Sequence, residues 1–413
     1  MRVGWDAKPL QALCNDFRQD IVDGPFGSEL QRRDYIEEGV PVLKIQNVKP
    51  FAIELKKMDY VSTAKFLELK RHSFQRGDIV MTKLGNPLGA SAIVEDLDEG
   101  LIVADLVRIR TYHINTRYLC YHLNSPGTSD FINSMQKGTT RPRVRLSVVR
   151  ELPIAAPPAQ EQQRIVDILD EAFAGITNAV ANAARSIQNA RAVFDSGVQF
   201  VFARRHVDWV EELVGSICDI KHGFAFDGAD FSRDVSEGNP LVITPGNFTE
   251  DGHLLFNEKN TKRFSGHVPI GFQFDVGDLV IVMTDLSSKM KILGKPAFVE
   301  TSDVLHNQRI GRVIFKNDWV EERFLYYFLM SEGFLRSIKE SATGTMVKHT
   351  APRRILGNTI PFPRDRERQR EVIDQLDSLR TETVRLQFVY RQKMAALDEL
   401  KQSLLHQAFS GQL

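Results

Sequence analysis

The chain has 413 residues, enough for about two to four domains of ordinary size. Its 53 Lys and Arg balance 53 Asp and Glu, which argues against a partner held by bulk charge, such as a histone-like or polybasic membrane-binding role. A content of 42% hydrophobic and 26% charged residues is typical of folded globular proteins. Three cysteines without a CxxC pair predict neither a disulfide framework nor a Cys-rich zinc module. With no apolar segment near ~20 residues and no apolar leader at the N-terminus, we expect a cytoplasmic globular protein.

The sequence contains an internal repeat. Trp5 and Cys14 recur as Trp209 and Cys218, both 204 residues later. Further pairs keep the same order with offsets of 199 to 207: 24–26 with 223–226, 41–43 with 240–242, 76–80 with 276–280, 138–139 with 344–345, 161–164 with 367–370, and 169–170 with 376–377. Coincidence of short matches is the alternative. The repeat predicts the order globule, helix, globule, helix.

Each globule alternates short β-type segments with turn residues. In the first half we predict strands at 41–45, 78–81, 101–103 and 106–109, followed by an aromatic-rich helix at 118–123. In the second half the corresponding segments are strands at 278–282 and 311–315 and a helix at 324–329. The coarse fold class is α+β.

Two long helices follow the globules. The segment from 159 to about 203 lacks proline and has apolar residues at near-heptad spacing. A second begins after Asp365, a plausible N-cap, and ends at Gly411. Each is about 65 Å long with a narrow apolar stripe, which predicts an intramolecular antiparallel coiled coil that holds the globules at a fixed separation. The predicted seam residues are Ile165, Leu169, Ile176, Val180 and Ile187 with Leu376, Leu379, Leu386, Leu397 and Leu404. Packing of each helix on its own globule alone is the alternative.

These elements predict four segments: a first globule (1–156), a central spacer helix (157–205), a second globule (206–362) and a C-terminal spacer helix (363–413).

Positive charge is concentrated in one segment of each globule. The stretch 137–150 holds five Lys and Arg and no acid, and 341–356 holds Lys348, Arg353 and Arg354, also without an acid. Each lies next to a paired Gly-Thr, whose N–H groups and hydroxyl suit phosphate oxygens, while Arg can also bind guanine in the major groove. A solvated surface is the alternative. The recurrence in both halves favours DNA binding, with a salt slope of roughly −4.5 for five phosphate contacts.

The candidate DNA contacts are polar residues in or beside the predicted turns. In the first globule they are Lys44, Asn47, Thr82, Lys83, Asn86, Lys137, Thr139, Thr140, Arg141, Arg143 and Arg145. In the second they are Thr244, Asn247, Thr284, Ser287, Lys289, Asn307, Arg309, Thr345, Lys348 and His349.

These motifs resemble the specificity (S) subunit of type I restriction–modification systems over essentially the whole chain. The resemblance is carried by Gly24–Ser28, the Gly-Asp turns at 77–78 and 277–278, 306–312, 158–165 and the C-terminal 397–411. The sequence departs from the family in a longer segment between Cys14 and Gly24, and in Glu367–Glu371, which stands where the first half has a Gln run.

The resemblance implies two target recognition domains, each binding one half of a split DNA sequence, and helices that dock two methyltransferase (M) subunits. Restriction–translocase (R) subunits join that complex. It further implies that this chain has no catalytic residues and binds no cofactor, since S-adenosylmethionine belongs to M, and ATP and Mg²⁺ to R.

No residue pattern supports an enzyme. The sequence around Asn86-Pro87-Leu88 lacks the second proline and the aromatic residue of an adenine methyltransferase motif, and no Gly-rich nucleotide-binding loop occurs. A nuclease hypothesis could use Asp59, Glu68 and Lys70, but Glu-x-Lys is common. We interpret His113, Cys120 and His122 as packing residues and expect no metal site.

Two functions are thus compared: a DNA-recognition subunit, and a coiled-coil scaffold that binds proteins and shows no DNA sequence preference. Because the two globules differ in sequence, the first hypothesis predicts an asymmetric, non-palindromic target. Its half-site centres would lie about 10 bp apart if both globules bind one face of the DNA.

Overall fold

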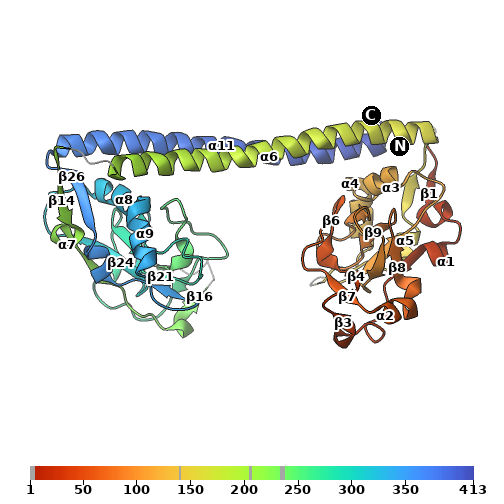
Figure 1. Ribbon diagram of the computed structural model, residues 1–413, viewed down its shortest axis with the longest axis horizontal. Coiled ribbons are helices and arrows are strands. Elements are labelled where there is room, and N and C mark those ends of the chain that lie inside the picture. The colour runs from red at the N-terminus through yellow and green to blue at the C-terminus, as the bar shows by residue number, and fades with distance from the viewer. Residues whose placement is uncertain (1–4, 139–140, 204–206, 233–237) are drawn as a thin grey trace. The chain divides into compact units, whose positions relative to one another are not determined.

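The computed structural model describes residues 5–138, 141–203, 207–232 and 238–413. It divides into two compact units: Met1–Ala183 with Arg391–Leu413, and Ala184–Tyr390. Each unit combines one globule with parts of both long helices (Figure 1). The predicted α+β class with two globules and two long helices is confirmed.

The first unit contains two principal sheets. One is antiparallel, in the order β10 (Ser91–Ile93), β9 (Ile79–Thr82), β12 (Leu106–Ile109), β2 (Ile21–Asp23). The other is mixed, in the order β3 (Tyr35–Ile36), β7 (Asp59–Val61), β4 (Val40–Leu43), β11 (Glu99–Ile102), β8 (Ser73–Gln75). Two short pairs are added, β1 (Ala7–Pro9) with β13 (Pro153–Ala155) and β5 (Val48–Lys49) with β6 (Ala52–Ile53).

The helices of this unit surround the sheets. They are α1 (Phe17–Asp20), α2 (Thr63–Glu68), α3 (Thr116–Leu123), α4 (Pro126–Met135) and α5 (Leu146–Arg150), with 3-10 turns η1 (Leu10–Leu13), η2 (Arg32–Asp34), η3 (Ile45–Asn47) and η4 (Lys70–His72).

The second unit repeats this plan. Its antiparallel sheet has the order β15 (Cys218–His222), β24 (Ile310–Phe315), β20 (Leu279–Val282), β22 (Pro296–Phe298). Its mixed sheet has the order β16 (Phe231–Ser232), β18 (Arg263–Phe264), β17 (Leu241–Ile243), β23 (Val304–His306), β19 (Gln273–Phe274). The short pairs are β14 (Trp209–Leu213) with β26 (Thr359–Pro363) and β21 (Thr284–Asp285) with β25 (Lys348–His349). The helices and turns are α7 (Val214–Ile217), α8 (Glu322–Met330), α9 (Glu332–Glu340), α10 (Pro352–Leu356), η5 (Gly228–Asp230) and η6 (Pro245–Asn247).

Two paired glycines show that the repeat extends to individual backbone contacts. A Cβ on Gly24 would lie 2.1 Å from the Val103 carbonyl carbon, and a Cβ on Gly223 would lie 2.2 Å from the Asn307 carbonyl oxygen. A residue with a Cβ would clash with the backbone at either position, so each position requires glycine. The five extra residues between Cys14 and Gly24 are accounted for by α1, whose N-cap Asp16 accepts from the Arg18 N–H.

The long helices have the predicted extents. Helix α6 spans Ala159–Ala203, and α11 spans Arg366–Ser410. The carboxylate of Asp365 accepts from the Glu367 N–H at 2.9 Å, and Gly411 has φ 80°, so both predicted end signals are present.

The two helices pair antiparallel within each unit. In the first unit, Arg164 near the start of α6 donates to the Leu413 carbonyl at 2.8 Å, and the Lys401 ammonium lies 4.8 Å from the Phe173 ring centroid. In the second unit, the Thr383 hydroxyl contacts the Ala190 carbonyl at 3.4 Å. The helices also pack on the globules, since Ile165 and Leu169 share a core cluster with Tyr118 and Leu119.

The burial of the predicted seam residues varies along the helices, and one residue of α11 needs a correction. Leu386 is 44% exposed, whereas Thr383 and Gln387 are each only 7% exposed. After the half-buried Leu379, the next enclosed positions are Thr383 and Gln387, at steps of four residues. The stripe therefore drifts away from a strict heptad, and Leu386 lies outside it. Among the other predicted seam residues, the buried ones are Ile165, Leu169, Ile176 and Leu376, and the half-buried ones are Val180, Ile187, Leu379, Leu397 and Leu404.

A buried glutamine fastens each long helix to its globule. Gln369 is fully buried, accepts from the Glu321 N–H at 2.8 Å and donates to the Trp319 and Pro363 carbonyls, each at 2.8 Å. Gln162 accepts from the Asn115 N–H at 2.8 Å and donates to the Pro157 carbonyl at 2.7 Å.

The glutamines therefore correspond with an offset of 207. This offset corrects by one residue the alignment of 161–164 with 367–370. The second half tolerates the loss of the Gln run because it keeps the one glutamine that is buried and bonded to the globule.

Candidate nucleic-acid interface

The candidate site begins where two neighbouring parallel strands end. Strands β4 and β11 are parallel, so the residues that follow them, Lys44 and 103–105, emerge at one edge of the sheet. In the second unit β17 and β23 are parallel, and Thr244 and 307–309 follow them. We call 103–105 and 307–309 the reading turns. Side chains at such a shared edge can converge on one ligand.

A hairpin lies next to each reading turn. Lys137 and Arg143 exchange backbone hydrogen bonds of 2.9 and 3.1 Å, as Thr343 and His349 do at 3.0 and 2.9 Å. The glycine after the first residue of each hairpin has a positive φ, 89° for Gly138 and 96° for Gly344, which its tight turn requires. The Gly-Thr repeat of the sequence thus marks the same hairpin in both units, although Thr139 and Thr140 lie outside the described residues.

In the first unit the structure gathers most predicted contact residues around two cavities. A cavity of about 550 Å³ is lined by Lys44, Thr82 and Asn86. A second, of about 430 Å³, is lined by Lys83, Lys137, Arg143 and Arg145. Asp105 of the reading turn lines both cavities, so this residue lies next to each of them.

The hairpin cations of the first unit are available to an anion. Lys137, Arg141, Arg143 and Arg145 are exposed and make no ion pair to any described residue. Lys44 and Lys83 differ, because Lys44 pairs with Asp59 and Lys83 pairs with Asp23 at 2.5 Å. Among the predicted contact residues of this unit, the unpaired positive charge therefore lies on 137–145, as phosphate binding requires.

The second unit assembles its candidates through strand pairing. Strand β21 pairs with β25, which places Thr284 opposite His349, and the Thr284 hydroxyl lies 3.0 Å from His349 Nδ1. The Arg309 carbonyl accepts from the Met283 N–H at 2.9 Å, which places the reading turn directly beside β21.

The remaining candidates of this unit lie in turns near the same strands. The Lys348 ammonium donates to the Gly344 carbonyl at 2.8 Å, and Thr345 is exposed at the tip of the hairpin. Ser287 and the exposed Lys289 follow β21, and the Ser287 hydroxyl accepts from the Lys289 N–H at 3.2 Å.

Two predicted contact residues have a structural role instead. Asn47 and Asn247 are 1% and 0% exposed. Asn47 accepts from the Lys44 N–H at 3.0 Å and donates to the Glu54 carbonyl at 2.9 Å, and Asn247 likewise accepts from the Thr244 N–H at 2.8 Å. Because their amides are buried and bonded, they shape the turns after β4 and β17 and cannot face DNA.

Two threonines are also enclosed. Thr82 is 1% exposed and donates to the Pro87 carbonyl at 3.0 Å, and Thr284 is 5% exposed. Both hold neighbouring turns in place, so their hydroxyls are positioning groups at the wall of the site.

Sequence reasoning missed Asp105 because it selected cations, amides and hydroxyls. The signal was nevertheless present: Asp105 follows β11 just as Arg309, which was selected, follows β23, with the offset of 204 that relates the tryptophans and cysteines.

Burial governs the protonation of the three thiols and of His122. Burial raises the pKa of Cys14, Cys120 and Cys218 to about 12, so these thiols are protonated at neutral pH. His122 is buried, its pKa is lowered to about 4 by that burial, and its Nε2 accepts from the Ala155 N–H at 3.2 Å. No group of three or more His, Cys, Asp or Glu able to hold a metal ion occurs among the described residues. In those same residues no helix combines the length and apolar character needed to cross a bilayer.

Comparison with known proteins agrees with this architecture. The family description "Type I restriction modification DNA specificity domain" matches residues 77–184, which include the first reading turn and hairpin. The specificity subunit of the type I restriction enzyme MjaVIII from Methanocaldococcus jannaschii is 23% identical over 340 residues, covering 76% of this chain and 75% of that protein. The EcoBI specificity subunit from Escherichia coli is 24% identical over 212 residues, which are 50% of this chain and 40% of that protein.

Solved structures share the fold. A chain from a structure describing complex assembly and conformational transition of the type I R-M system has a TM-score of 0.72 at 18% identity, covering 100% of this chain and 99% of its own length. The HsdS subunit from Thermoanaerobacter tengcongensis has a TM-score of 0.54 at 19% identity, covering 100% and 98%.

The repeated globule, with a reading turn and a hairpin in each copy, defines a tandem architecture that the solved structures share. In sequence, the chain is similar to the specificity subunits of type I restriction–modification systems.

Proposed function

We propose that this chain is a non-catalytic subunit that directs a type I restriction–modification complex to a bipartite, asymmetric DNA target. One half-site is bound by the first globule and the other by the second. The observation that carries the proposal is the recurrence of one backbone arrangement, reading turn beside hairpin, with different side chains in each copy. Equivalent backbone supports a shared way of approaching DNA, and different side chains support different half-sites.

The chemistry of the first site fits duplex DNA. Exposed Lys137, Arg141, Arg143 and Arg145 suit phosphate oxygens or guanine edges. Asn86 lines the adjoining cavity and has an amide suited to adenine. A protein-binding scaffold would not need an unpaired cationic hairpin next to a cavity that Asn86 and Asp105 line.

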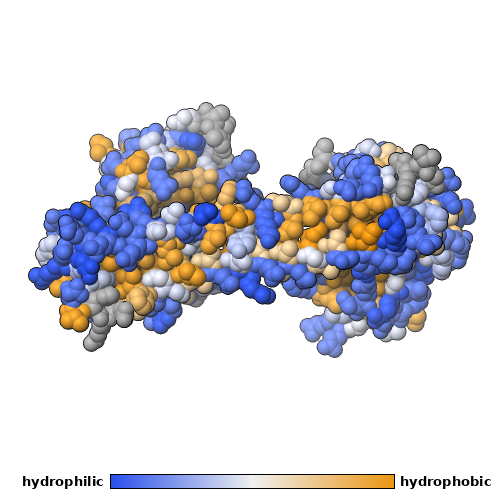
Figure 2. All heavy atoms as spheres, turned by 90° about the horizontal axis from the view of Figure 1, so that it is seen from above, coloured by the Kyte–Doolittle hydropathy of each residue, from blue (hydrophilic) through white to orange (hydrophobic). Residues whose placement is uncertain are grey.

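The long helices supply surfaces for partner subunits. In the second unit, apolar side chains on their outer faces are strongly exposed: Val193 57%, Phe200 62%, Val384 50% and Phe388 58%. In the first unit, Figure 2 shows a band of apolar side chains on the helices, at the right of the view. Exposed apolar side chains grouped on helices are typical of protein–protein contacts.

On this proposal, methyltransferase subunits dock on these helices and restriction subunits join the same complex. S-adenosylmethionine would then be held by the methyltransferase subunits and ATP with Mg²⁺ by the restriction subunits, with none of them bound by this chain. The complex acts on DNA in the cytoplasm.

The test is genome-wide mapping of N6-methyladenine in the native host with and without this gene. Loss of one split motif with a spacer of fixed length is the expected result. If the map is unchanged, a band-shift with the co-expressed methyltransferase subunits decides the outcome. Sequence-specific binding supports the proposal, and DNA binding without sequence preference overturns it in favour of the scaffold.

A further inference from the structure

Asp105 and Arg309 occupy the same backbone position in the two units. The Asp105 carbonyl accepts from the Lys83 N–H at 2.9 Å, and the Arg309 carbonyl accepts from the Met283 N–H at the same distance. Two residues earlier in each turn, the backbone packs against the paired glycines 24 and 223. The repeat thus presents a carboxylate at one copy of this position and a guanidinium at the other.

Neither side chain has a structural partner among the described residues. No ion pair or side-chain hydrogen bond to described residues engages the Asp105 carboxylate, although it lines a cavity together with Lys137, Arg143 and Arg145. Among the described residues the exposed Arg309 is engaged through its backbone: its N–H donates to the Asn307 side chain at 3.1 Å, and its carbonyl accepts from the Met283 N–H. A side chain that fixed the fold would be buried or paired, and these are neither.

A carboxylate among hairpin cations is unexpected in a surface that binds only phosphates. It repels phosphate oxygens and weakens the field of the lysine and arginines around it. It suits an interface in which a base edge offers an N–H group, because a carboxylate can only accept hydrogen bonds at neutral pH.

We propose that Asp105 and Arg309 are equivalent base-reading residues, each determining one base pair of its half-site; this rests on the proposed function. Asp105 accepts from an exocyclic amino group in the major groove, cytosine N4 in the first instance and adenine N6 as the second possibility. Arg309 donates to O6 and N7 of guanine at the corresponding position of the other half-site. One backbone position thereby selects opposite hydrogen-bonding partners in the two copies.

The experiment uses the full-length chain co-expressed with its methyltransferase subunits in a host that lacks other adenine methylation, followed by mapping of the methylated motif. The test variants are Asp105→Ala, Asp105→Leu, which keeps the shape of the side chain without an acceptor, and Arg309→Ala. Matched controls are Asp96→Ala, an exposed acid in the same unit, and Arg336→Ala, an exposed guanidinium on α9 of the other unit.

The expected result is local. Either substitution of Asp105 should reduce discrimination at one position of one half-site by about tenfold to a hundredfold and leave the other half-site unchanged. Arg309→Ala should do the same to a guanine in the other half-site. Both controls should keep the wild-type motif.

Three outcomes separate the explanations. An unchanged motif in Asp105→Leu and in Arg309→Ala overturns the reading pair. Loss of all methylation in Asp105→Ala, with the wild-type motif kept by the nearly isosteric Asp105→Leu, which has no acceptor, also overturns it, since the residue would then be structural. If the wild-type complex methylates DNA without any split motif, the proposed function itself fails, independently of the variants.

Discussion

Removing the Gln369 side chain should loosen the attachment of α11 to the second globule. The amide is fully buried, and Gln369→Ala deletes three hydrogen bonds of 2.8 Å while leaving one N–H and two carbonyl groups without that partner. At about 1 kcal/mol of net stabilisation per hydrogen bond, the loss is about 3 kcal/mol. For a unit of this size, each kcal/mol lowers Tm by about 2–4 °C, so a decrease of about 6–12 °C is expected.

The assay is calorimetry of the full-length chain. Gln162→Ala, which deletes two hydrogen bonds in the first unit, should cost about 2 kcal/mol. The exposed neighbour Arg368, paired only with Glu371 at the surface, is the control, and its replacement by alanine should change stability by less than about 0.5 kcal/mol. A Gln369→Ala chain that melts within about 2 °C of wild type would show that these hydrogen bonds do not hold the helix.

Three further predictions concern charge, burial and backbone packing. Replacing both Lys137 and Arg143 by alanine should reduce the slope of log K against log salt by about 1.8, at 0.9 per phosphate contact, measured by DNA-binding anisotropy of the assembled complex; an unchanged slope would exclude phosphate contacts at both residues. Lys295→Met should stabilise the second unit by at most about 3 kcal/mol at pH 7. It should also abolish the rise in the stability of this unit as pH increases from about 8 to 10.4, measured by melting at a series of pH values. Equal pH profiles of the wild-type and variant proteins would contradict this. Gly223→Ala should destabilise the second unit by about 1–3 kcal/mol or more and disturb methylation at one half-site only, because its Cβ would lie 2.2 Å from the Asn307 carbonyl; a normal motif and an unchanged Tm would refute this packing argument.

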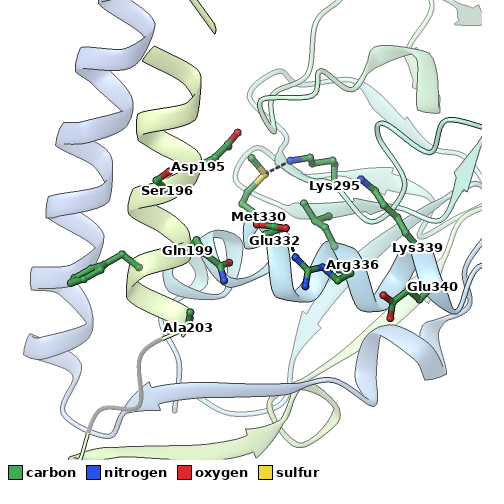
Figure 3. A pocket seen from close by; sticks show the side chains of 12 residues that line it. Asp195, Ser196, Gln199, Ala203, Lys295, Met330, Glu332, Arg336, Lys339 and Glu340 are labelled. Carbon is green, nitrogen blue, oxygen red and sulfur yellow. Dashed lines mark hydrogen bonds and ion pairs between the residues drawn. The ribbon is translucent and has the colours of Figure 1, made fainter. Parts of the chain in front are cut away.

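The sign of the Lys295 effect follows from its surroundings. Burial lowers its pKa to about 8, and its ammonium has a Met330 sulfur at 3.9 Å and no carboxylate ion pair among the described residues (Figure 3). The folded chain therefore binds this proton less tightly than the unfolded chain, whose lysines titrate near 10.4. Between these values the unfolded state holds more protons, so stability rises with pH, and below pH 8 the full cost of the buried charge is present. The side chain lines a cavity of about 670 Å³ between α6 and α9, where methionine has room to pack.

The sequence predicted those features that depend on local periodicity. The bounds of α6 were anticipated because a proline-free near-heptad signals its extent residue by residue, and the strands around Ile79 and Leu106 follow from short apolar segments between turns. Leu386 was misplaced because a strict heptad cannot anticipate a drift of the stripe, which depends on how α11 packs locally.

Site residues were harder to predict because their roles depend on distant segments. Asn47 looks like an exposed polar residue after a strand, yet its amide is bonded to the carbonyl of Glu54, and that of Asn247 to the carbonyl of Asn260. No local pattern distinguishes such an amide from one that binds DNA. The repeat could have identified Asp105, because comparison of equivalent positions requires only the correct offset.

The structure separates what positions the site from what determines specificity. Backbone contacts hold the reading turns. Gly24 packs closely against Val103, and Gly223 packs closely against Asn307. The Lys83 N–H also donates to the backbone carbonyl at position 105. None of these contacts uses the side chain at 105 or 309. On the proposed function, a substitution at either position changes the hydrogen bonds offered to a base while these backbone contacts are kept. Two copies of one fold could in this way bind unrelated half-sites, and their targets could diverge by substitution at a few such positions.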